Sequence, residues 1–143
     1  MKAHQMFRES VEYKEKFWSE QAENIEWFKK PTQIITDDGQ NYPTWFSDGE
    51  LNTCYLALDK HINDGFSDQV AIIYDSPVTS RIIKYTYSEV WEQVSKLAGG
   101  LQNLGLQKGD TAIIYMPMIP QSVFAMLACA RLGVTPSVVF GGF

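Results

Sequence analysis

Apolar residues recur at helical spacing in parts of the chain and form short continuous runs in others. Near the start, Phe17 and Trp18 lie on one face of a charged segment, which predicts an amphipathic helix over roughly Ser10 to Glu23. Prolines and an Asp-Gly turn interrupt residues 31–43 and predict irregular structure or short strands. A second helix is predicted over residues 51–62, ending before an Asn-Asp-Gly turn.

A β-hairpin is predicted next. The apolar, β-branched run Val70 to Tyr74 is typical of a strand. The turn Asp75-Ser76-Pro77 follows it, and Arg81 to Tyr85 returns as the expected partner strand.

The helix after this hairpin has the clearest end signals. Thr86, with Glu89 three residues later, predicts a capping box in which hydroxyl and carboxylate bond free backbone N–H groups. Gly105 is placed as a glycine that ends a helix. The apolar positions of one face are Val90, Trp91, Val94, Leu97, Ala98, Leu101 and Leu104. We interpret the internal pair Gly99-Gly100 as a point of close packing against a neighbouring element.

The last part of the chain predicts a βαβ unit. Thr111 to Tyr115 is apolar without alternation, as in a strand covered on both faces. A helix over Gln121 to Leu132, ended by Gly133, leads to a final strand over Ser137 to Phe140. Strand, helix and strand imply a parallel pair with a right-handed crossover, so the fold class is α/β. Because two parallel strands leave edges open and apolar faces uncovered, we expect a part of a larger fold.

Composition narrows the class of protein. With 45% hydrophobic and 20% charged residues over 143 positions, the chain is typical of one globular domain. A net charge of −5 with scattered Lys and Arg argues against nucleic-acid binding. No run is long enough for a membrane span, and the N-terminus resembles neither a signal nor a transit peptide, so we expect a cytoplasmic protein. Cys54 and Cys129 are expected to be buried, reduced thiols.

Several motifs in a fixed order resemble the acetyl- and propionyl-CoA synthetases of the adenylate-forming superfamily. They are Glu15 to Trp18, Trp45 to Asn52, Leu58 to His61, Gly109 to Pro120, Met126 to Arg131 and Val138 to Phe143. The segment Ile72 to Thr79 is most similar to the propionate-preferring branch. Leu56 and the Val134-Thr135-Pro136 run depart from the usual family pattern.

The resemblance implies a fold and a division of the chain. Residues 1–68 would form the N-terminal cap region of an acetyl-CoA synthetase, helical and irregular. Residues 69–143 would begin the AMP-binding (adenylation) domain, truncated here, with the hairpin and the first βαβ unit of its larger parallel sheet.

The resemblance also implies a two-step reaction. A short-chain carboxylate, propionate or acetate, attacks the α-phosphate of ATP to give an acyl-adenylate and pyrophosphate. The CoA thiol then displaces AMP to form acyl-CoA. The family uses Mg²⁺ together with three sequence features: a Ser/Thr/Gly-rich loop ending in Lys, a ribose-binding aspartate and a late lysine. None of these three features occurs in this sequence. We therefore expect no catalytic residue, no metal ligand, no tightly bound cofactor and no activity in this fragment by itself.

One candidate binding site remains at the end of the last strand. Glycines after a parallel strand let a ligand approach the backbone, and ligands bind at the carboxyl ends of such strands. The resemblance places Phe140, Gly141 and Gly142 beside CoA. The residues by themselves do not distinguish this binding role from a tight turn without a ligand. Lone histidines, His4 and His61, are interpreted as capping or surface residues.

Two other functional classes stay open at this point. One is a non-catalytic binding or interaction module derived from a synthetase. The other is an unrelated nucleotide-binding α/β domain, which the ordered motifs disfavour. The length of the complete gene would separate the enzyme from the module.

Overall fold

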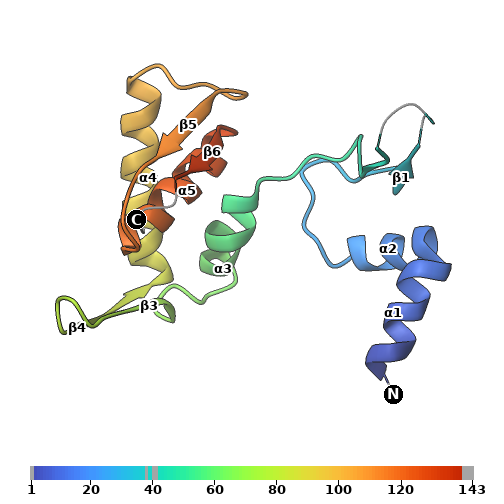
Figure 1. The fold of residues 1–143 in the computed structure, drawn as a ribbon, viewed down its shortest axis with the longest axis horizontal. Coiled ribbons are helices and arrows are strands. Elements are labelled where there is room, and N and C mark those ends of the chain that lie inside the picture. Colours follow the sequence, from blue (N-terminus) through green and yellow to red (C-terminus); the bar gives the residue numbers. More distant parts are fainter. Residues whose placement is uncertain (1, 38, 40–41, 140–143) are drawn as a thin grey trace. The chain divides into compact units, whose positions relative to one another are not determined.

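The computed structural model describes residues 2–37, 39 and 42–139 (Figure 1). The chain divides into two compact units, residues 1–51 and 52–143, and each is described by itself. Helices and small sheets are mixed in an α/β arrangement, as the hydrophobic pattern predicts.

The first unit begins with two helices where the sequence predicts one. Helix α1 covers Lys2–Glu12 and α2 covers Lys14–Ala22. Tyr13 separates them with backbone angles φ −120° and ψ 43°, outside the helical region. The prediction of a start near Ser10 is wrong because residues 2–9 contain no Gly or Pro and consist largely of good helix formers.

A short antiparallel pair follows, in the region predicted to be irregular or to contain short strands. Strand β1 (Ile35–Thr36) pairs with β2 (Thr44–Trp45). Beside it, the Asp48 carboxylate accepts hydrogen bonds from the Thr32 hydroxyl and from the backbone N–H groups of Thr32 and Gln33. These bonds, the Thr32 hydroxyl first, lower the pKa of Asp48 to about 2.

Aromatic rings supply most of the packing in this unit. Trp18 contacts both Phe17 and Trp45, with ring centroids 5.2 and 5.8 Å apart. Phe46 lies against Trp45 at 6.1 Å and against Trp27 at 5.5 Å. Among the described residues of the unit only Ala22 is fully buried. The unit is therefore held by ring contacts more than by a closed apolar core.

Gly49 is required by the approach of Trp27. A Cβ built at this position would lie 2.9 Å from the Trp27 ring and 3.2 Å from Pro31 Cβ. The ring has little freedom to retreat, because its indole N–H donates to the Ala22 carbonyl at 2.9 Å. The glycine of the Trp45 to Asn52 motif is thus explained by packing.

The second unit opens with a helical segment that is not uniform. Residues 53–63 are helical, close to the predicted 51–62, but Tyr55–Asp59 forms a π-helix, η1, before α3 (Lys60–Asn63). No feature of the hydrophobic pattern predicts the wider turn.

The hairpin and the helix after it are confirmed, but the turn lies at residues 77–80, because Asp75 and Ser76, predicted to be in the turn, still pair with Ile82 and Arg81. Strands β3 (Val70–Ser76) and β4 (Arg81–Thr86) pair antiparallel and lead into α4 (Tyr87–Asn103). The Glu89 N–H donates to the Thr86 hydroxyl at 3.2 Å, and the Thr86 N–H donates to the Glu89 carboxylate at 2.8 Å. These two bonds complete the predicted capping box.

The last three elements form the predicted parallel unit. Strand β5 (Thr111–Ile114) pairs parallel with β6 (Thr135–Val138), and α5 (Pro120–Leu132) connects them (Figure 1). The last strand was expected over residues 137–140. Pairing begins earlier because the Thr135 N–H donates to the Asp110 carbonyl at 2.8 Å. Phe140, at the end of the predicted strand, lies outside the described residues.

The core of the second unit is the contact between α4 and α5. Val90, Val94 and Ala98 of α4 pack with Phe124 and Ala128 of α5. The buried face of α4 agrees with the predicted apolar stripe, except that Trp91 and Leu104 at its margins are exposed.

The glycine pair of α4 does not fit our interpretation. A Cβ at Gly99 or Gly100 would meet no atom within 4 Å in this chain. Close packing against a neighbouring element is therefore wrong for the described residues. Both glycines only weaken the helix, by about 1 kcal/mol each relative to alanine.

Two glycine-to-alanine changes should have opposite effects on stability. Gly99→Ala should raise the free energy of unfolding by roughly 0.5–1 kcal/mol, because it adds helix propensity in open space. Gly49→Ala should lower it by roughly 1–3 kcal/mol, because the added methyl group displaces the Trp27 ring. Urea unfolding followed by circular dichroism measures both. A neutral Gly49→Ala would contradict the packing explanation.

Candidate functional site

The carboxyl ends of β5 and β6 meet at one edge of their sheet. Parallel register pairs Ile114 with Val138, and the Val139 N–H donates to the Ile114 carbonyl at 2.9 Å. Beyond β5 the chain passes through an exposed loop to α5, whose first residue is Pro120. In open α/β sheets this edge is where ligands bind.

The predicted CoA-binding residues follow this edge directly in sequence. Phe140, Gly141 and Gly142 lie outside the described residues, so their geometry is not part of the structure. Val139 is the last described residue before them. The assignment to CoA stays a prediction.

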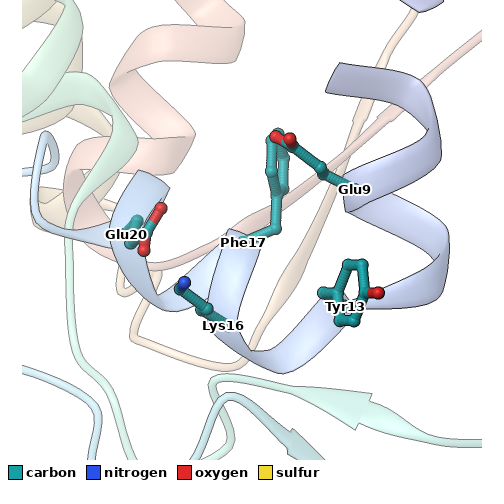
Figure 2. Close-up of a pocket in the computed structure, with 5 residues that line it drawn as sticks. All are labelled: Glu9, Tyr13, Lys16, Phe17 and Glu20. Carbon is teal, nitrogen blue, oxygen red and sulfur yellow. The ribbon is translucent and has the colours of Figure 1, made fainter. Parts of the chain in front are cut away.

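A surface hollow of about 300 Å³ lies between α1 and α2 in the first unit (Figure 2). Its lining residues are Glu9, Tyr13, Lys16, Phe17 and Glu20. Lys16 and Glu20 are exposed on α2. Nothing in this set pairs a nucleophile with a base, so the hollow has no catalytic arrangement.

The most organised polar cluster joins three elements of the second unit. Arg131, near the end of α5, donates from Nη2 to Asp59 Oδ2 at 2.7 Å. The indole N–H of Trp91 donates to the other carboxylate oxygen of Asp59, also at 2.7 Å. The Arg131 guanidinium lies 5.8 Å from the centre of the Trp91 ring. Both charged side chains are less than a quarter exposed, so the pair is shielded from water on most sides.

Asn52 adds a second connection to the end of α5. Its side-chain N–H₂ group donates to the carbonyls of Ala130 and Arg131 at 3.0 and 3.1 Å. Its side-chain oxygen accepts from the Tyr55 N–H at 3.1 Å and so caps the helical segment that follows. One amide therefore bonds the last carbonyls of one helix and a free N–H of another.

The two thiols are confirmed as buried and reduced. Cys54 and Cys129 are free cysteines with almost no exposed surface. Burial raises the pKa of both thiols, and the Arg131 guanidinium opposes only part of the effect on Cys54. A protonated, buried thiol is a poor nucleophile, so neither residue is a catalytic candidate.

Neither a metal centre nor a membrane span is found in the part of the chain that the structure describes. No group of three or more His, Cys, Asp or Glu side chains in that part could hold a metal ion. His61 instead lies against the Tyr87 ring with centroids 4.8 Å apart. None of its helices is long and apolar enough to cross a bilayer.

Two family models match the chain in succession. The model described as "Acetyl-coenzyme A synthetase N-terminus" matches residues 3–57. The model described as "AMP-binding enzyme" matches residues 60–143, more than half of the chain. The chain belongs to the AMP-binding enzyme family. This family assignment confirms the resemblance carried by the ordered motifs.

Individual members of the family agree with this assignment. Acyl-CoA synthetase short-chain family member 3, mitochondrial, from Homo sapiens is 53% identical over 137 residues, which is 96% of this chain. Acetyl-coenzyme A synthetase from Streptomyces avermitilis is 48% identical over 128 residues, 89% of this chain. The structure of acetoacetyl-CoA synthetase from Streptomyces lividans superposes with a TM-score of 0.83 at 29% identity, over 94% of this chain.

The matched region is a small part of these enzymes. The chain spans 20% of the human relative, 19% of the Streptomyces avermitilis enzyme and 21% of the acetoacetyl-CoA synthetase chain. Its first part, residues 3–57, matches the model of the acetyl-coenzyme A synthetase N-terminus, so the chain corresponds to the N-terminal region of such relatives.

The sequence pattern does not predict the Asp59–Arg131–Trp91 cluster. The position of Arg131 near a helix C-terminus is sufficiently explained, from the sequence, by the favourable interaction of a cation with the helix dipole. The motifs Leu58 to His61 and Met126 to Arg131 both contain cluster residues. Their joint occurrence was the available signal, but the partners are 72 residues apart and only the fold brings them together.

Breaking this cluster should destabilise the second unit. Arg131→Met should lower the free energy of unfolding by roughly 1–3 kcal/mol, because Asp59 would keep a shielded charge without its cation. Lys96→Met is the matched control, since it breaks the exposed Lys96–Glu92 pair within α4 and should cost less than about 0.5 kcal/mol. Urea unfolding measures both, and equal effects would refute a structural role for the cluster.

Proposed function

We propose that the full-length protein containing this chain is an ATP-dependent, AMP-forming short-chain acyl-CoA synthetase. A carboxylate oxygen attacks the α-phosphorus of ATP, forming an acyl-adenylate and releasing pyrophosphate. The CoA sulfur then attacks the acyl carbon, and AMP leaves as the thioester forms. The observation that carries this proposal is the ordered match of both family models over nearly the whole chain.

Propionate or acetate is the proposed acid. Relatives named as short-chain family members and as acetyl-coenzyme A synthetase support this class of substrate. The segment Ile72 to Thr79, which covers most of β3 and of the turn after it, favours propionate by its resemblance alone. We also propose a cytoplasmic location, although several relatives are named as mitochondrial proteins.

The described residues contribute scaffold to this reaction. The α4–α5 core and the Asp59–Arg131 pair hold β5 and β6 so that their carboxyl ends form one edge. Magnesium neutralises phosphate charge in phosphoryl chemistry of this kind. The described residues contain no group of side chains fit to hold it, so no step through the metal is assigned to this chain.

Activity should belong to the full-length protein and not to this chain. Purified full-length enzyme should catalyse pyrophosphate exchange and form acyl-CoA, with higher kcat/KM for propionate or acetate than for medium-chain or aromatic acids. The 143-residue chain should give no exchange above background, because the phosphate loop and the late lysine are missing from its sequence. A preference for longer acids would refute the substrate class. Pyrophosphate exchange by the 143-residue chain would refute the prediction that activity needs the full-length protein.

Substitution of Gly142, which follows β6 in the sequence, should slow the second half-reaction more than the first. Gly142→Leu in the full-length enzyme places a side chain where CoA is proposed to approach the backbone. The rate of thioester formation should fall at least about tenfold more than the rate of pyrophosphate exchange. A tenfold loss corresponds to a rise of about 1.4 kcal/mol in the activation free energy of that step. Gly99→Leu is the control, because its position is open in this chain. Equal losses in both half-reactions would refute a role of Gly142 in CoA binding.

A further inference from the structure

A hollow of about 430 Å³, here called the β5 hollow, lies between α4 and the start of α5 in the second unit. It lies beside the loop that leaves β5, because Met116 in its wall follows the last residue of that strand, Ile114, by two positions. The hollow therefore borders the sheet edge that also precedes the predicted CoA-binding residues. Its volume is within the range of about 300–1,000 Å³ that is typical of ligand pockets. Its lining residues are Gln93, Lys96, Leu97, Met116, Gln121 and Phe124.

The β5 hollow has an apolar inner wall and a polar rim. Phe124 is almost fully buried and Leu97 is partly buried, so these two side chains form the inner wall. Gln93, Lys96 and Gln121 are exposed and surround the opening. An apolar wall with a few polar groups that converge on it is the usual composition of a small-molecule site.

The polar groups are suited to a purine nucleotide. Lys96 brings a cation, which pairs with phosphate oxygens. Gln93 and Gln121 each carry an amide with donor and acceptor side by side, and such an amide matches the donor and acceptor at the edge of adenine. Met116 adds a thioether, which makes favourable contacts with aromatic rings. Together these side chains fit an adenine ring attached to phosphate.

Lys96 can be released for a ligand at little cost. Its ammonium group donates to the Glu92 carboxylate at 2.6 Å, across one turn of α4. The two side chains are 67% and 56% exposed, and an exposed pair of this kind contributes little because water screens it. Glu92 itself does not line the β5 hollow. A phosphate in the hollow can therefore replace Glu92 as the partner of Lys96.

The hollow between α1 and α2 provides the contrast. Its wall carries one lysine, Lys16, and two glutamates, Glu9 and Glu20, so its net charge repels phosphate (Figure 2). None of the residues that line the β5 hollow is acidic. Of these two hollows, only the one beside β5 has the charge that a nucleotide requires.

We propose that the β5 hollow binds the nucleotide end of CoA, with Lys96 paired to one of its phosphates. Two nucleotides enter the proposed reaction, ATP and CoA. The resemblance assigns the phosphates and ribose of ATP to a loop, an aspartate and a lysine that this sequence lacks. CoA is the nucleotide predicted at the edge that the hollow borders. The inference rests on the proposed function and adds side chains of α4 and α5 to the predicted site.

Calorimetric titration of CoA into the full-length protein tests this site without using turnover. Lys96→Met should raise the Kd of CoA about tenfold, because a hydrogen bond from a charged group to phosphate is lost. Gln121→Leu should raise it roughly threefold or more, as for the loss of one neutral hydrogen bond. Lys84→Met is the matched control, since it removes the same charge from an exposed position on β4 that does not line the hollow. Its Kd should stay within about twofold of the unmodified protein.

A fragment of CoA identifies which end of the molecule occupies the hollow. Adenosine 3′,5′-bisphosphate is the nucleotide end without pantetheine. It should compete with CoA for the unmodified protein, and Lys96→Met should weaken its binding by the same factor as that of CoA. Displacement of this fragment by ATP but not by CoA would assign the hollow to ATP and overturn the proposal.

Unchanged CoA affinity in both Lys96→Met and Gln121→Leu would also overturn it, including the case in which another segment of the enzyme fills the hollow. An equal loss in Lys84→Met would show a general effect of charge and would overturn it as well. Urea unfolding of each variant separates lost binding from lost folding. A protein that binds CoA through Lys96 but makes no acyl-CoA would refute the proposed activity alone. An active enzyme whose CoA affinity does not depend on Lys96 and Gln121 would refute the hollow alone.

Discussion

Burial of one stripe of α4 against α5 is the interaction on which the second unit depends. Val90 and Val94 are fully buried there, and Ala98 lets the helices approach closely above them. The hairpin is attached because β4 runs straight into α4, and the parallel strands are attached because α5 connects them. Removing apolar area at this contact would loosen all of these elements together, since no other large cluster of buried residues occurs among the described residues of the unit.

The first unit is stabilised by a different set of interactions. Its ring contacts bury partial surfaces, and the Asp48 carboxylate adds polar support by bonding the chain near Thr32. The Trp45 to Asn52 motif therefore combines several separate tasks in eight positions: ring packing, a carboxylate bridge, close approach at Gly49 and helix capping. Short motifs of this kind are specific because each residue must fit a different neighbouring group.

Signals that act over a few residues were readable from the sequence. The capping box of Thr86 and Glu89 and the left-handed Gly133 at the end of α5 depend on local backbone bonds, and the structure confirms both. Whether Gly99 touches a neighbour depends on which element packs there, and no local pattern contains that information. The pairing of Arg131 with Asp59 likewise depends on the tertiary fold. For the candidate site, the sequence located an edge of the parallel strands, and the CoA assignment at Phe140 to Gly142 depends on resemblance.

The two-sided hydrogen bonding of Asn52 gives this chain a chemical vulnerability. Its N–H₂ group faces the last carbonyls of α5, at the negative end of that helix. Deamidation, the slow hydrolysis of an asparagine side chain, would replace these donors with a carboxylate oxygen. Attraction to the carbonyls of Ala130 and Arg131 would become repulsion, while the cap on the Tyr55 N–H would survive. Deamidation would thus break the hydrogen bonds between Asn52 and the end of α5. The cap at the start of the helical segment over residues 53–63 would remain.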